Sequence, residues 1–245
     1  MRSFVLAPVL ALAVAACGAA PSDDSASQDQ AFAKSDYAED SLLPYSGGWL
    51  DVPKALAGVG QFDRLKSTVH DGSKCSTMVA LAAAIVGGRD AFLAFVAKVA
   101  ALRSAHADDL AVTAQVTASV DALTPRLLHT FTEVVVRAYG VENGAYDGDI
   151  AKMIRASGWS SVNVGSKKPA DLVASLDDGD IVPLATVADN EAHITLLWKD
   201  ASGVVRLYDS DDIHGSHVLP RGGALYDARV DDPQSGWDLR EKFVR

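Results

Sequence analysis

Three side chains, a cysteine, a histidine and an aspartate, stand where they could form a nucleophilic site. Cys75 lies in the stretch DGSKCSTMVA, directly before an apolar run that ends at residue 86. His193 begins the segment HITLLWKD, whose apolar residues we expect to alternate, and Asp209 lies near the end of VVRLYDSD. A thiol attacks well when it ionises, when a base takes its proton, and when a third group orients that base. These residue types therefore predict thiol-dependent chemistry on a carbonyl group.

The segments around these residues predict how they would be positioned. Residues 76–86 are dense in Ala, Leu, Ile and Val, which predicts a buried helix, and the free N–H groups at its start would favour a thiolate at Cys75. The segments of His193 and Asp209 predict an antiparallel hairpin that turns at Gly203. Because the start of one hairpin strand lies beside the end of the next, we expect His193 and Asp209 to be neighbours.

The rest of the chain places helices before strands. Residues 42–71 mix aromatic residues with Gly and Pro and predict a packed, irregular lead-in. Further helices are expected over 89–105, 108–122, 125–139, with Thr124 as cap and Gly140 as end, and 147–158. A last helix is expected to start at Pro169 and to end in a turn before residue 180. Strands are expected over 159–165, 181–187, 193–200, 204–211, 216–220 and 224–230. This order predicts an α+β fold with an N-terminal helical half and a C-terminal antiparallel β-sheet half.

The first forty residues predict export. Residues 1–16 form a short apolar stretch with one arginine, which is typical of a secretory signal peptide. The stretch VAAC, ending at Cys17, resembles a bacterial lipobox, in which the cysteine is lipidated. By that resemblance we expect a lipid anchor on Cys17 and, with Gly18 following, an outer-membrane location; the alternative is an ordinary secreted protein. Residues 17–41 are rich in Ser, Asp and Ala and predict a disordered tether, which leaves residues 42–245 as one domain.

The arrangement of Cys75, His193 and Asp209 resembles the papain-like cysteine peptidase superfamily. The closest likeness is to the double-glycine leader peptidases that process bacteriocins, and it covers about residues 61–212. The resemblance implies that Cys75 is the nucleophile, His193 the general base and acid, and Asp209 the orienting group. The chain departs from the family at residues 68–72, where no glutamine stands to stabilise an oxyanion, since Gln61 is fourteen residues before the cysteine.

These observations predict a cell-envelope lipoprotein that hydrolyses or transfers an amide bond in a peptide or a peptidoglycan stem. One alternative is an inactive papain-like module that binds a peptide or an envelope protein. Transglutaminase-like proteins share the order of Cys, His and Asp, but the aromatic-rich segments expected around the cysteine and histidine are missing. A structural lipoprotein, in which Cys75 is a small core residue, is a further alternative.

Charge and spacing argue against other partners. The net charge of −10 and the lack of a basic cluster make nucleic acid a poor partner. Residues 209–212 lack the spacing of a calcium loop and predict a solvated turn. His214 and His217 are separated by a glycine and have no third ligand at metal-site spacing. The sequence therefore predicts no metal and no cofactor.

Overall fold

The computed structural model describes residues 40–66, 74–145, 147–164, 171, 174–188, 191–210, 216–218 and 241–245. Its helices are α1 (Val52–Lys66), α2 (Lys74–Val86), α3 (Arg89–Leu102), α4 (Ala107–Ala118), α5 (Pro125–Tyr139) and α6 (Asp147–Arg155). Its strands are β1 (Tyr45–Ser46), β2 (Trp49–Leu50), β3 (Ser160–Asn163), β4 (Ile181–Ala188), β5 (Glu191–Lys199), β6 (Val205–Tyr208), β7 (Ser216–Val218) and β8 (Glu241–Val244). The α+β class is confirmed, with the helices before the large sheet in the chain.

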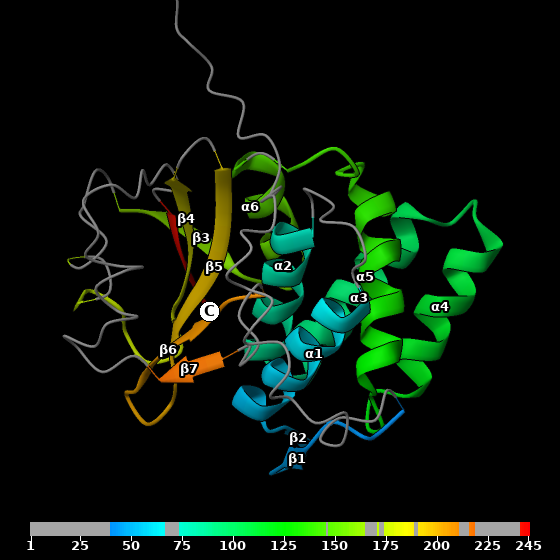
Figure 1. Ribbon diagram of the computed structural model, residues 1–245, viewed down its shortest axis with the longest axis horizontal. Coiled ribbons are helices and arrows are strands. Elements are labelled where there is room, and N and C mark those ends of the chain that lie inside the picture. The colour runs from blue at the N-terminus through cyan, green and yellow to red at the C-terminus, as the bar shows by residue number, and fades with distance from the viewer. Residues whose placement is uncertain are drawn as a thin grey trace, which may run out of the picture.

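The large sheet has six strands in the order β3-β8-β4-β5-β6-β7, and neighbouring strands pair antiparallel. The expected hairpin is present as β5 and β6, whose turn is closed by a hydrogen bond from the Gly203 amide to the Asp200 carbonyl. The late strand β8 lies between β3 and β4. The sheet stands on the left of Figure 1, and the helices lie on its right.

Helix α2 lies between the sheet and the other long helices (Figure 1). Every residue from Cys75 to Ile85 is buried, at 6% exposure or less. Short side chains explain this position, because four alanines allow neighbouring elements to approach the helix from all sides. The predicted buried helix over 76–86 is therefore confirmed.

The central strands are buried on both faces. The helix-facing side carries Ile181, Ile194, Leu196, Trp198, Tyr208 and Phe243, which belong to the same core as α2. Val182, Leu184, Leu197 and Leu207 are buried as well, on the alternate positions. The expected alternation after His193 is therefore wrong, because residues 194–198 are apolar or hydrogen-bonded and buried without a break.

The predicted helix from Thr124 to Gly140 is confirmed with its ends. The Thr124 side chain accepts a hydrogen bond from the Leu127 amide, Pro125 takes the first helical position, and Gly140 adopts the left-handed conformation with φ 65°. Phe131 and Val135 point into the core that α2 shares. Residues 104–145 thus contribute scaffold to the described fold.

The prediction of an irregular lead-in over residues 42–71 is wrong in part. Residues 52–66 form helix α1 despite Gly58 and Gly60. Ala55, Leu56 and Val59 are all buried at 1% exposure or less, so apolar packing outweighs the glycines' weak helix propensity. Of the expected helix that starts at Pro169, residues 171 and 174–179 are described, and residues 175–179 are a turn and not helical. The expected strand at 224–230 lies wholly outside the described residues. Within the described part of the chain, no helix is both long and apolar enough to cross a membrane.

Candidate functional site

Cys75 is the second residue of α2 and is 6% exposed. At this position the helix offers backbone N–H groups that favour an anion. The structure holds Cys75 in a disulfide, and it contains no free cysteine among the described residues. Thiolate chemistry at Cys75 therefore requires the reduced form. Cys17, the predicted lipidation site, lies outside the described residues.

His193 is the third residue of β5, and its backbone stands opposite Thr186 of β4. Asp209 follows directly after β6 and is 1% exposed. The last β5 and β6 pair is Leu196 with Tyr208, so Asp209 continues toward the end of β5 that carries His193. Continued by one residue beyond β6, this pairing places Asp209 opposite Thr195, two residues from His193 and about 7 Å from it along the strand direction.

The far end of α2 fixes its level against the sheet. The Arg245 guanidinium donates a hydrogen bond to the Gly87 carbonyl, just beyond the last residue of α2. Arg245 follows β8, whose Phe243 stands opposite Ile181, and Ile181 stands opposite Trp198 of β5. The carboxyl end of α2 therefore lies at the end of the sheet where β5 finishes.

The lengths of α2 and β5 then place the starts of both elements toward the same end of the sheet. From Gly87 back to Cys75 the helix rises about 18 Å, at about 1.5 Å per residue. Arg245 stands two residues beyond Phe243 and is therefore level with Asp200. From Asp200 back to His193 the strand spans about 24 Å, at about 3.4 Å per residue. Because α2 packs against β5, these lengths carry the backbones of Cys75 and His193 toward the same end of the helix and sheet layers. His193 occupies the strand position that alternates with the helix-facing Ile194.

Three side chains hold the last turn of α2. The Trp159 indole donates to the Ala83 carbonyl at 3.0 Å, and the Trp49 indole donates to the Ile85 carbonyl at 3.0 Å. The Arg245 guanidinium also lies over the Trp159 ring, 5.3 Å from its centroid. The two indoles add a second donor to carbonyls that already accept the backbone N–H groups of Gly87 and Gly88. The helix that carries Cys75 is thus fixed at its opposite end.

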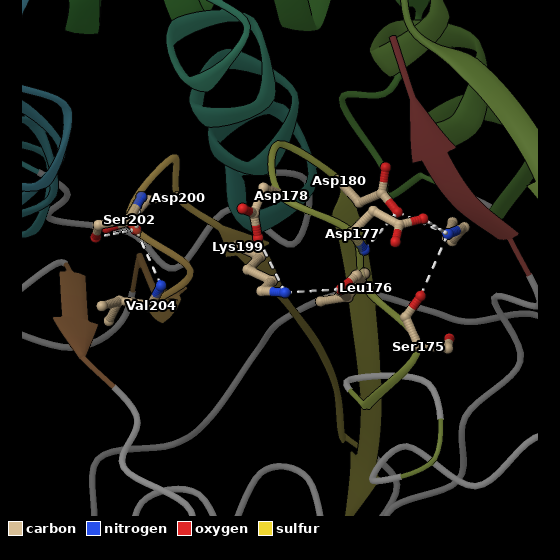
Figure 2. A network of polar contacts seen from close by, with 10 residues as sticks. Ser175, Leu176, Asp177, Asp178, Asp180, Lys199, Asp200, Ser202 and Val204 are labelled. Carbon is tan, nitrogen blue, oxygen red and sulfur yellow. Dashed lines mark hydrogen bonds and ion pairs between the residues drawn. The ribbon is translucent and has the colours of Figure 1, made fainter.

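Figure 2 shows a polar network at the other end of β5 from His193. Lys242 of β8 contacts the Asp180 carboxylate at 2.6 Å, and Lys199 contacts Asp178 at 2.9 Å. The hydrogen bond with Asp180 raises the pKa of Lys242. In the adjoining turn Asp200 accepts hydrogen bonds from Ser202 and Arg206, which hold its pKa at about 2 against the opposing effect of burial. These groups fix the turns on each side of β4 and β5, far from Cys75.

The prediction of a solvated turn at residues 209–212 is wrong for its first half. Asp209 and Ser210 are buried, at 1% and 6% exposure. Sequence reasoning missed Ser210, although the apolar Leu207 and Tyr208 before it are a signal that the chain is still inside the core. Residues 211–215, with His214, lie outside the described part. Among the described residues, no group of three or more His, Cys, Asp or Glu side chains could hold a metal ion.

Comparison with known proteins gives no relative for this chain. No protein-family model matches it. No curated protein and no solved structure matches it either. The functional argument therefore rests on the residues and their placement.

Proposed function

We propose that this chain is a cell-envelope lipoprotein whose papain-like domain uses Cys75 to hydrolyse or transfer an amide bond in a peptide or a peptidoglycan stem. The observation that carries the proposal is that the backbones of Cys75, at the start of α2, and His193, near the start of β5, lie toward the same end of the helix and sheet layers. Asp209, buried just beyond β6, is the group that continues toward the same end of the sheet. The proposed site uses no metal and no cofactor.

The roles follow from the chemistry of an amide. His193 takes the proton of the Cys75 thiol, and the thiolate attacks the carbonyl carbon. The imidazolium then gives this proton to the leaving amine as the carbon–nitrogen bond breaks, which leaves a thioester on Cys75. Water, or an amine in a transfer reaction, attacks the thioester with His193 again as base, and the thiol is regenerated. Asp209 orients the imidazole and stabilises its charged form.

The redox state of Cys75 sets a condition on this activity. A disulfide sulfur is not a nucleophile, so the site acts only after reduction of the bond that the structure contains. Cys17 is the other cysteine of the chain, and a thioether to lipid on Cys17 would leave Cys75 without a disulfide partner in its own chain. The lipid anchor itself is tested by the mass of the amino-terminal peptide of the mature protein, which should carry acyl chains in the native chain and none in Cys17→Ala.

The test of the site is the pH dependence of Cys75 alkylation in the reduced full chain that carries Cys17→Ala, so that Cys75 is the single thiol. An activated cysteine would give an apparent pKa well below the ordinary thiol value of about 8.5, and His193→Ala would raise it. His106→Ala is the matched control, because His106 is exposed at the start of α4 and should leave the profile unchanged. A profile near the ordinary value in both native chain and His193→Ala would refute the activated site.

A second function is an inactive module that binds a peptide or an envelope protein. The burial of Cys75 and its disulfide favour this alternative, since both are compatible with a structural role. It predicts that Cys75→Ser leaves the biological function of the protein unchanged. Loss of function in Cys75→Ser, with a normal unfolding curve, would exclude the alternative.

A further inference from the structure

The strongest unexplained polar group lies directly beside the candidate site. Ser210 is 6% exposed, and its hydroxyl oxygen is buried without a hydrogen-bond partner among the described residues. Buried hydroxyl groups nearly always have such a partner, because desolvation without one costs free energy. Ser157 shows the usual case, since it is fully buried and its hydroxyl donates to the Ile154 carbonyl at 2.9 Å.

The position of Ser210 relates it to the reacting residues. It follows Asp209, and it stands two residues beyond Tyr208, the last residue of β6. Tyr208 stands opposite Leu196, on the side of the sheet that faces the helices. Since β6 runs toward the end of the sheet where β5 begins, the chain carries Ser210 toward the level of Cys75 and His193.

We propose that the Ser210 hydroxyl is a substrate-binding group that donates a hydrogen bond to the carbonyl oxygen of the amide that Cys75 attacks. This inference rests on the proposed function, and it names the amide group as the part of the substrate that the site recognises. A buried polar group in a binding site can lack a partner in the free protein, because the ligand supplies that partner when it binds. The free-energy cost of the unpaired hydroxyl is then balanced by binding.

The experiment compares two reagents on Cys75 in the reduced full chain carrying Cys17→Ala. Iodoacetamide has an amide carbonyl, whereas methyl methanethiosulfonate has none, and both react with the thiolate. The ratio of their rate constants therefore reports amide recognition and cancels changes in the amount of thiolate. Ser210→Ala should lower this ratio by about tenfold, the effect of one hydrogen bond. Ser210→Thr keeps a hydroxyl and should retain most of the ratio.

Ser157→Ala is the matched control. It removes a buried hydroxyl that is already paired, so it should lower the free energy of unfolding and leave the reagent ratio unchanged. Ser210→Ala removes no hydrogen bond to the residues that the structure describes, so its unfolding midpoint should equal or exceed that of the parent chain. An unchanged ratio in Ser210→Ala overturns the inference. This failure differs from failure of the proposed function, which is read from the His193 dependence of the alkylation pH profile.

Discussion

The indole nitrogen of Trp159 lies 3.0 Å from the carbonyl oxygen of Ala83, although 76 positions separate the two residues in the chain. This hydrogen bond joins the segment before β3 to the last turn of α2. Trp159→Phe keeps most of the ring and removes the donor, so we expect a loss of about 1 kcal/mol in the free energy of unfolding. Urea denaturation measures it. Trp49→Phe removes the analogous donor to Ile85 and should cost a similar amount; an unchanged midpoint in both variants would contradict this view of the helix end.

Gly87, the residue directly after α2, is tightly packed. A Cβ atom there would lie 2.7 Å from the Ala91 Cβ and 3.3 Å from the Trp159 indole nitrogen. We therefore expect Gly87→Ala to destabilise the domain by about 1 to 3 kcal/mol through overpacking. Gly148 is the control, because it is an exposed helical glycine with nothing within 4 Å of its Cβ position. Gly148→Ala should stabilise the chain by about 0.5 to 1 kcal/mol, and thermal unfolding of the two variants should shift in opposite directions.

Asp109 joins α3, α4 and α5 through two arginines. Its carboxylate lies 2.6 Å from Arg103 and 2.8 Å from Arg137, and it is buried. Asp109→Ala leaves the arginines without this carboxylate, and we expect a loss of about 3 kcal/mol in unfolding free energy. Asp121 is the control, since its ion pair with Arg89 is exposed. Asp121→Ala should leave the unfolding midpoint nearly unchanged, and equal losses in the two variants would contradict the assignment.

The same carboxylate predicts a dependence on acid. The hydrogen bond from Arg137, followed by that from Arg103, lowers the pKa of Asp109 below its ordinary value, against the opposing effect of burial. Its contribution to stability is therefore fully present above about pH 4, the unfolded pKa, and is lost as the pH falls through the folded pKa. The stability of Asp109→Ala should decline less steeply than that of the native chain over this range. Parallel acid-unfolding curves would refute this contribution.

Tyr139 predicts a dependence on alkali. Its hydroxyl is buried without a hydrogen-bond partner among the residues described, and burial raises the pKa of Tyr139 to about 12. The unfolded phenol ionises near pH 10, so folding stability falls as the pH rises from about 10 to about 12. Tyr139→Phe should abolish this part of the decline and should not destabilise the chain at neutral pH. A tyrosine absorbance titration of the folded chain that lacks a group near pH 12 would contradict the prediction.

Sequence reasoning succeeded where the signal is local. The ends of α5 are set by Thr124, Pro125 and Gly140, and the β5 and β6 hairpin is marked by Gly203, so a short window of sequence predicts both. Helix α1 was missed because its glycines are common in loops, whereas the burial that stabilises it depends on distant elements. The burial of Ser210 was missed for the same reason.

The candidate site, too, could be predicted from the sequence only in part. The residue types of Cys75, His193 and Asp209, and their places near element ends, are visible in the sequence. The level of α2 against β5 is not, because it depends on the contact of Arg245 with Gly87, 158 positions apart. Pairing of β8 with β3 and β4 likewise has no local pattern that predicts it.

The place of β8 between β3 and β4 has a consequence for the order of assembly. β3 pairs with β8 through Ser160 and Val244, so β3 cannot join the sheet until a segment more than eighty residues later has been synthesised. During synthesis α2, α6 and β3 therefore leave the ribosome well before β8 is available to complete the sheet. Contacts this distant in sequence slow folding and lengthen the life of partly exposed apolar surface. A chain that crosses a membrane before folding would gain from this delay, because the domain stays open until its final strand arrives.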